Sequence, residues 1–210
     1  MAIEDYTSYT EEDPSSDLTV IAGKITVDTI NRSTNAWVVK DLGAGFFSGP
    51  FKHNFDYKIT ASSSQSLQGP HMLGSIVGTH KSHVIAAADA ILVQMSETSG
   101  GANNIFLKET SGGGETTSSI NTSISENTQY YLTLERDASN LYTLSVYTDA
   151  GRTTLLGTET LAATPGLAFQ YAYGMVNPGA TGAVPSSYIV SNLEFLPVSS
   201  TSKKKTHWGP

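Results

Sequence analysis

The sequence predicts an all-β fold in which two antiparallel sheets pack face to face as a sandwich. Short runs of alternating apolar and polar residues recur along the chain, and a period of two is typical of a strand with one buried face. Gly, Ser, Asn or Pro separates nearly every pair of runs, as expected for turns between strands. No run has a convincing helical period, so we expect less than about a tenth of the residues to be helical.

The composition agrees with one such domain. The chain has 210 residues, a length that all-β sandwiches often reach as a single domain. Charged residues make up only 15% of it, against a typical ~25%, and 19 glycines supply turn positions. The net charge of −7 argues against a nucleic-acid partner, and the lack of cysteine excludes disulfides and thiol chemistry.

The two ends differ from the middle of the chain. Residues 1–17 are acidic and contain no apolar run, so they do not resemble a Sec signal peptide and we expect a polar arm. No stretch approaches the ~18 apolar residues that span a membrane, so we expect no membrane insertion. We therefore divide the chain into an N-terminal arm (1–17), a β-sandwich domain (18–198) and a polar C-terminal tail (199–210).

The expected strands follow one another closely through the domain. In order they are 18–30, 36–42, 51–62, 72–78, 88–96, 103–109, 116–122, 129–137, 141–149, 153–161, 167–175 and 186–196. A single sheet of roughly a dozen strands would curl or split in two, which favours a two-sheet sandwich of jelly-roll type.

The run FKHNFDYKIT (51–60) shows the alternation most clearly. Phe51, His53, Phe55, Tyr57 and Ile59 occupy one face of the predicted strand, and lysine, asparagine and aspartate occupy the other. A second clear unit spans 129–161, where Tyr130, Leu132 and Leu134 share a face of one strand and Tyr142, Leu144 and Val146 share a face of the next. The short RDASN loop between those strands predicts an antiparallel hairpin.

The run from ILVQMSETSGGANNIFLKE to YYLTLERDASNLYTLSVYTDAGRTTLLGT resembles concanavalin A-like, laminin-G-like jelly-roll domains. The earlier AWVVKDLGAGFFSGPFKHNFDYKI fits the same pattern, and together these segments cover about two thirds of the chain. Sequences of this style resemble those encoded in phage and environmental viral genomes. The resemblance implies the fold more than an activity, because this superfold hosts lectins, glycanases, lyases and structural modules.

We expect no enzymatic activity, with a polysaccharide-degrading enzyme as an alternative. Retaining glycosidases need two carboxyl groups about 5–5.5 Å apart, and Asp56 is the only acid in its strand. Lyase relatives need clustered Arg, Gln, His and Tyr, whereas Arg32, Arg136 and Arg152 sit at strand ends or turns. No G-x-S-x-G motif is present to carry a serine nucleophile.

We expect no cofactor and no resident metal. His80 and His83 have H-x-x-H spacing, but GTHKSH predicts a polar loop with solvated imidazoles rather than a ligand pair. Calcium is the alternative that the resemblance allows, with oxygen ligands from strand edges and loops: Asp41, Asp89, Asp149 and Asn177.

Two interpretations of the polar face at 52–58 stay open. It is either a solvated or subunit-facing sheet, or a weak glycan platform. In the second case Asn54 and Asp56 would supply hydrogen bonds, and Trp37 or Tyr173 would supply a stacking face; Trp37 is otherwise a core aromatic.

The N-terminal arm and the C-terminal tail also have two interpretations: they are disordered, or they dock onto a partner protein. Aromatic residues and opposite charges suit docking, with candidate anchors Tyr6, Tyr9, Lys203, Lys204, Lys205 and Trp208. We expect a non-enzymatic structural protein on a virion surface, assembled in the host cytoplasm as a capsid decoration protein or similar component. Its expected partners are other copies of itself, a capsid or tail shell protein, and cell-surface glycans. A carbohydrate-binding module outside any virion is the alternative.

Overall fold

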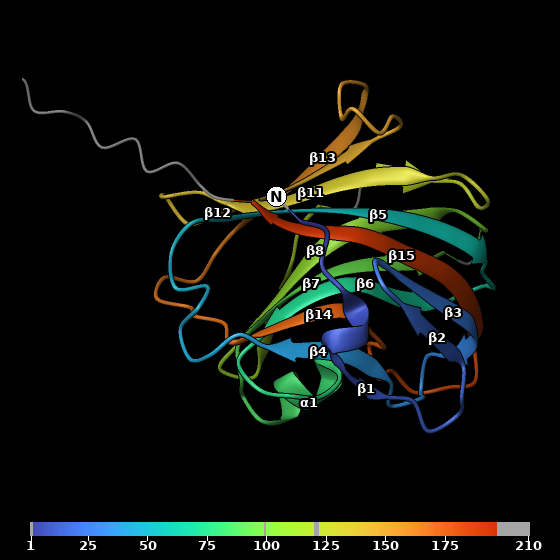
Figure 1. The fold of residues 1–210 in the computed structure, drawn as a ribbon, viewed down its shortest axis with the longest axis horizontal. Helices are drawn as coiled ribbons and strands as arrows, with labels where there is room; N and C mark the ends of the chain where they lie inside the picture. Colours follow the sequence, from blue (N-terminus) through green and yellow to red (C-terminus); the bar gives the residue numbers. More distant parts are fainter. Residues whose placement is uncertain (1, 99, 120–121, 197–210) are drawn as a thin grey trace, which may run out of the picture.

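The computed structural model describes residues 2–98, 100–119 and 122–196 and confirms the predicted all-β sandwich (Figure 1). Sheet A has eight strands; its order is β1 (Thr10–Glu12), β4 (Trp37–Asp41), β14 (Tyr171–Val176), β6 (Leu67–Gly74), β7 (Ala90–Glu97), β8 (Asn103–Ser111) and β10 (Thr122–Ile124), with β9 (Gly114–Thr117) paired to β8. Sheet B has seven; its order is β13 (Leu155–Ala162), β12 (Leu141–Tyr147), β11 (Tyr130–Arg136), β5 (Phe51–Ala61), β15 (Pro185–Leu196), β3 (Lys24–Asn31) and β2 (Leu18–Ile21).

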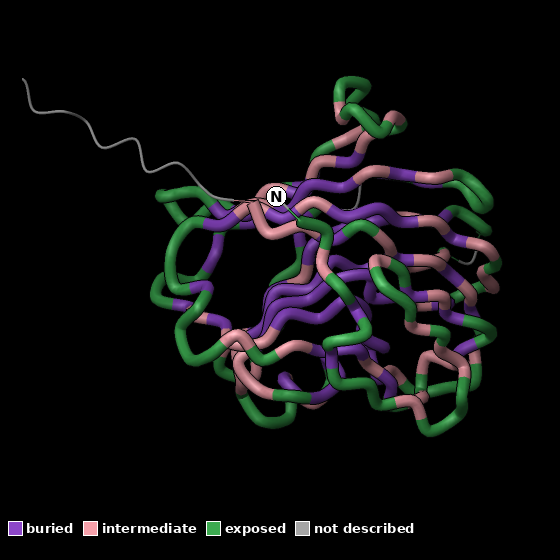
Figure 2. The backbone as a smooth tube through the Cα atoms, viewed as in Figure 1, coloured by how far each residue is buried: buried purple, intermediate pink, exposed green. Residues whose placement is uncertain are grey.

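The core lies between the two sheets, and the period-two pattern predicts its members correctly. In β5 the side chains of Phe55, Tyr57 and Ile59 are fully buried in it, while Lys52 and Lys58 point to the other face and are only partly buried. Figure 2 shows the same alternation of buried and less buried residues along the strands. The predicted hairpin is also present, because β11 and β12 pair antiparallel from Tyr131 to Arg136.

The N-terminal segment packs as part of the sandwich, which differs from the polar arm that we expected. A 3₁₀ turn, η1 (Tyr6–Ser8), is capped by the Asp5 carboxylate, and β1 then pairs with β4 at the edge of sheet A. Tyr6 is fully buried next to Ile25 and Gly174, and Tyr9 is buried beside it. None of the acidic residues in this segment is buried, so the acidic composition gives no sign that Tyr6 and Tyr9 lie in the core.

Burial also means that Tyr6 and Tyr9 are not exposed docking anchors in this structure. The other predicted anchors, Lys203, Lys204, Lys205 and Trp208, lie outside the described residues.

The segment GTHKSH is not a solvated loop, so that expectation was wrong. It forms the short helix α1 (His80–Ile85), with the Thr79 side chain as its N-cap. His80 and His83 are buried against the outer face of sheet A, where Nε2 of His80 lies 2.7 Å from Oγ1 of Thr110. A Cβ at Gly74 of β6 would lie only 2.4 Å from Nε2 of His83, so only glycine admits this ring.

The same segment covers part of the outer face of sheet A. The backbone N–H of Gly78 donates to the Tyr173 hydroxyl (3.0 Å), which in turn donates to the carbonyl of Ile76 (2.8 Å). Beside Tyr173 lies a small second core, and its members are Val39, Met72, Ala90, Leu92 and Val176. Among the described residues, no helix has the length and hydrophobicity that crossing a membrane requires.

Candidate functional site

The outer face of sheet B carries a row of polar and aromatic side chains that runs across its strands. In the pairing registers, Lys24 of β3 lies opposite Ser191 of β15, Ser191 opposite Asp56 of β5, and Asp56 opposite Tyr131 of β11. Paired residues on adjacent strands point to the same face, so these four side chains form a line perpendicular to the strands. The row brings together residues that lie far apart in the sequence.

A β-bulge in β15 shapes the centre of this row. The register between β15 and β5 shifts between Ser191 and Glu194, and Asn192 adopts a left-handed backbone with φ of 55°. Asparagine tolerates this conformation better than most residues, and bulges commonly redirect a side chain. Here the bulge lets Nδ2 of Asn192 donate to Oδ2 of Asp56 at 2.7 Å.

The bulge also marks the place where β15 changes partner. The N–H of Asn192 donates to the carbonyl of Gly23, in the turn of the β2–β3 hairpin, at 2.9 Å. One residue later the carbonyl of Leu193 accepts from the N–H of Glu4 at 2.8 Å. The N-terminal segment thus continues along β15 where the hairpin ends, and the junction leaves a notch in the sheet surface.

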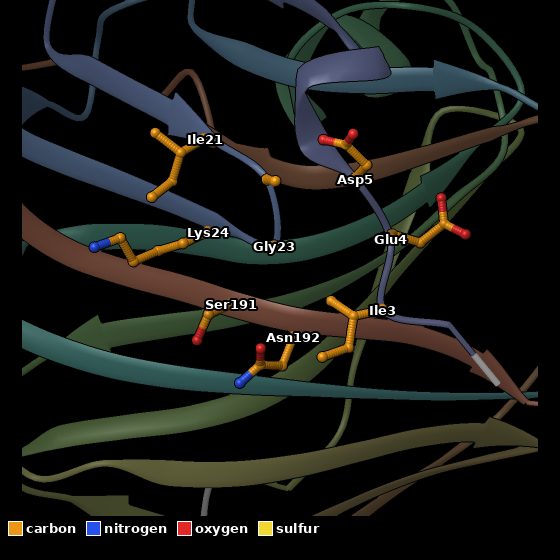
Figure 3. A pocket seen from close by; sticks show the side chains of 9 residues that line it. Ile3, Glu4, Asp5, Ile21, Gly23, Lys24, Ser191 and Asn192 are labelled. Carbon is orange, nitrogen blue, oxygen red and sulfur yellow. The ribbon is translucent and has the colours of Figure 1, made fainter.

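Two adjoining pockets occupy this region. The notch pocket has a volume of about 590 Å³ and lies between the hairpin turn and the N-terminal segment (Figure 3); its lining includes Ile3, Asp5, Ile21, Lys24, Ser191 and Asn192. The arginine pocket, of about 160 Å³, is lined by Ile3, Asp56, Tyr131, Ala150, Arg152, Asn192 and Glu194. Because Ile3 and Asn192 line both, the two pockets are neighbours.

Asp56 is held by two donors at the base of the arginine pocket. Nη2 of Arg152 donates to its Oδ1 at 3.1 Å, and Asn192 donates to Oδ2. Burial raises the pKa of Asp56, and the carboxylate of Glu194 adds to the rise, while the hydrogen bonds and charge from Asn192 and Arg152 oppose it. The result is a desolvated carboxylate with a fixed orientation.

Arg152 comes from the hairpin loop between β12 and β13, which is ordered by its own contacts. The Asp149 carboxylate accepts from the backbone N–H groups of Thr153 and Thr154, and these bonds lower the pKa of Asp149. The Arg152 guanidinium lies 5.9 Å from the centre of the Tyr131 ring, in cation–π range. Its Nε is buried and has no hydrogen-bond partner within the described part of the chain.

The predicted glycan-binding residues divide between two faces. Asn54 and Asp56 lie on the outer face of sheet B, where Asn54 accepts a hydrogen bond from the Thr133 hydroxyl at 2.8 Å. Trp37 and Tyr173 lie on the outer face of sheet A, where Tyr173 is fully buried and Trp37 packs half-buried against the second core. The structure therefore brings together only the first pair.

Of the polar residues that line the arginine pocket, sequence reasoning named only Asp56 and missed Tyr131, Arg152, Asn192 and Glu194. The alternation in QYYLTLERD places Tyr131 on the outer face, and that signal was available. The bulge at Asn192 and the hydrogen bond from Arg152 to Asp56 of β5 have no local sequence signature.

Within the described ranges, no group of three or more His, Asp or Glu side chains is arranged to hold a metal ion. Three of the four residues suggested for calcium, all except Asp89, have side-chain contacts of their own. Asp41 accepts from Nε2 of Gln170 at 2.9 Å, Asn177 donates to the carbonyl of Asn31 at 2.7 Å, and Asp149 orders its own turn. The expectation of no resident metal and the calcium alternative both stay untested.

No family model matches the sequence, and no curated protein sequence is similar to it. Solved structures do match the fold. A legume lectin-like domain from Entamoeba histolytica has a TM-score of 0.59 at 11% identity, with 90% of each chain covered. The alginate lyase Aly36B has a TM-score of 0.57 at 11% identity, covering 92% of this chain and 88% of the lyase.

The exoplasmic/lumenal domain of VIP36, in its Ca²⁺/Man3GlcNAc-bound form, has a TM-score of 0.53 at 6% identity, covering 95% of this chain and 87% of that one. This protein has a lectin-like, concanavalin A-like jelly-roll fold. Identities this low establish the fold alone, because the same fold carries both lectins and lyases.

Proposed function

We propose that this protein binds a glycan without cleaving it, in the two adjoining pockets on the outer face of sheet B. The observation that carries the proposal is the fixed Asp56 carboxylate, held by Arg152 and Asn192 beside the Tyr131 ring. Sugar hydroxyls both donate and accept hydrogen bonds, so they suit a site with an oriented carboxylate, an amide and a guanidinium. The lectin-like fold supports the same class of ligand.

Binding fits the site better than cleavage does. Glycosidases use one carboxyl group as a proton donor and a second as a base or nucleophile. Asp56 is engaged by two donors, which leaves it poorly suited to either role. Glu194 is a second carboxylate in the arginine pocket, and alginate lyases share the fold, so a test for cleavage belongs with the binding assay.

The test is a glycan array followed by titration calorimetry on the strongest ligand. We expect Asp56→Ala and Arg152→Ala to weaken binding roughly 10- to 100-fold, because a hydrogen bond to a charged group contributes about 1.5–3 kcal/mol. Trp37→Phe on sheet A is the matched control and should bind like the wild type. Loss of binding in Trp37→Phe alone would move the site to sheet A. New reducing ends or unsaturated products that disappear in Glu194→Gln would establish an enzyme instead.

The virion surface role predicted from the sequence is a separate proposal about where such a binder acts. A lectin-like binder displayed in many copies would gain from avidity even with weak individual sites. Mass spectrometry of purified particles tests it, and absence of the protein from them would leave the free carbohydrate-binding module.

A further inference from the structure

We infer that the ligand is an uncharged oligosaccharide whose chain runs across β5, β15 and β3, from the arginine pocket into the notch pocket. This inference rests on the proposed function, and it adds the class of the saccharide and the direction of the chain.

The first argument is the continuity of the two pockets. Ile3 and Asn192 belong to both linings. Asp56 of the arginine pocket is paired with Ser191 of the notch pocket, and Ser191 is paired with Lys24, so one row of side chains connects the two pockets. Two strand spacings separate Asp56 from Lys24, roughly 10 Å. Pockets for small organic ligands usually measure about 300–1,000 Å³, so the notch pocket is large enough for such a ligand and the arginine pocket is too small on its own.

The second argument concerns the walls of the site. The arginine pocket is bounded on the β11 side by the hairpin loop that carries Ala150 and Arg152, so a chain bound there extends toward the notch. In the notch pocket, Ile21 and Ile3 lie on opposite sides of Gly23 (Figure 3). Their side chains are 46% and 49% exposed, and they present apolar surface to the C–H groups of a sugar ring. The polar side chains of the strand row and the apolar side chains of Ile21 and Ile3 together match the amphipathic surface of a saccharide.

The third argument is charge. Four acidic side chains line the two pockets, Glu4, Asp5, Asp56 and Glu194, against two basic ones, Lys24 and Arg152. Arg152 is paired with Asp56, and Glu4 is paired with Lys40 at 2.7 Å, so Asp5 and Glu194 remain against Lys24. Hydrogen bonds from Thr7 lower the pKa of Asp5, so this carboxyl stays ionised. With a net charge of −7 on the whole chain, a polyuronate would meet repulsion both at a distance and in the pockets. An uncharged oligosaccharide would not meet this repulsion.

The experiment measures affinity by calorimetry for uncharged gluco- and manno-oligosaccharides of two to six units and for oligouronates of the same lengths. We expect the uncharged hexamer to bind the wild type at least fivefold more tightly than the dimer. Ile21→Ala and Ser191→Ala in the notch pocket should lower hexamer affinity at least fivefold, and so should Arg152→Ala in the arginine pocket, because a hexamer contacts both pockets. A dimer is too short to fill both pockets, so its affinity should respond to substitutions in one pocket only. Leu141→Ala, at a half-exposed leucine in β12 away from both pockets, is the matched control.

The failures can be told apart. Binding that does not depend on chain length, with no effect of Ile21→Ala or Ser191→Ala, would overturn the chain direction and leave the proposed function standing. Tighter binding of oligouronates than of uncharged chains would overturn the saccharide class. If neither kind of oligosaccharide binds the wild type, the proposed function fails, and this inference fails with it.

Discussion

The imidazoles of His53 and His71 are hydrogen-bonded to each other in the core, with Nδ1 of His53 3.0 Å from Nε2 of His71. Nδ1 of His71 lies 2.7 Å from the carbonyl oxygen of Tyr173, which can only accept, so this nitrogen carries the proton. Nε2 of His71 therefore accepts from His53, and both rings are neutral. Burial lowers the pKa of both rings, that of His71 to about 4.

We predict that the protein loses stability as the pH falls below about 6.5. His53, His71, His80 and His83 all have a pKa lowered by burial, that of His80 to about 3. The unfolded chain binds protons at these rings below pH 6.5 while the folded protein does not, so acid favours unfolding by roughly 1.4 kcal/mol per pH unit for each ring. The loss continues until the folded rings themselves titrate.

Urea unfolding midpoints at pH 7.5, 6.5, 5.5 and 4.5 measure this effect. The double variant His53→Leu/His71→Met removes both members of the hydrogen-bonded pair, and we expect a shallower dependence on pH. The raised pKa values of Glu11, Asp17 and Asp56 act in the opposite direction, while the lowered pKa values of Asp5, Asp137 and Asp149 act in the same direction as the four rings. A midpoint that is constant from pH 7.5 to 4.5 would contradict the prediction.

Tyr6 is predicted to stabilise the sandwich through its ring and not through its hydroxyl. The ring is fully buried against Ile25 and Gly174, while the hydroxyl is buried with no hydrogen-bond partner among the described residues. Tyr6→Ala should cost roughly 3–5 kcal/mol, as for other large buried aromatics. Tyr6→Phe should change the free energy of unfolding by less than about 1 kcal/mol, because it removes only an unsatisfied polar group. Equal losses in the two variants would show that the hydroxyl is bonded after all.

Arg136 is predicted to anchor two loops from inside the fold. Its guanidinium donates to the carbonyls of Phe47 (2.7 Å), Leu167 (2.9 Å) and Gly49, and lies 5.1 Å from the Phe51 ring centre. A lysine ammonium cannot reproduce this planar set of donors, so Arg136→Lys should destabilise the protein by roughly 2–4 kcal/mol.

The matched control is Arg152→Lys, whose side chain is partly exposed and where lysine keeps the positive charge beside Asp56, so we expect a smaller change, below about 1 kcal/mol. Chemical denaturation followed by far-UV circular dichroism compares the two. A similar small effect for both would mean that the carbonyl contacts of Arg136 are replaced by solvent.

The parts of the fold that sequence predicts well are those in which local alternation decides the outcome. In β5 the odd residues from Phe51 to Ile59 are buried because a strand with one face on a core has to alternate. Tyr6 lies in the core although its neighbours are acidic, since one aromatic ring fits above Gly174. The helix at His80–Ile85 is too short to show a period, and its histidines are buried by tertiary contacts that the local sequence does not specify.

The candidate site depends on contacts that local patterns cannot predict. Asn54 and Asp56 were assigned to the outer face correctly, but the partners of Asp56 come from far along the chain. Asn192 is 136 residues away from it and Arg152 is 96 residues away. Which strands become neighbours, and where a bulge forms, is decided by the packing of the whole sandwich.

Asn192 allows the last prediction to separate a structural role from a binding role. Its left-handed backbone (φ 55°) suits glycine, so the free energy of unfolding of Asn192→Gly should lie within about 1 kcal/mol of the wild-type value. In Asn192→Ala the free energy of unfolding should fall by roughly 1–2 kcal/mol, because alanine disfavours this conformation. Both variants remove the amide that donates to Asp56, a bond that lowers the pKa of this carboxyl, so that pKa should rise in both. Carbon-detected NMR titration of the Asp56 carboxyl measures the rise. Glycan affinity should fall equally in both variants, because the oriented carboxylate is lost in each. If Asn192→Gly keeps full affinity while the pKa of Asp56 rises, the orientation of Asp56 does not determine binding, and the ligand is held by the remaining side chains of the notch.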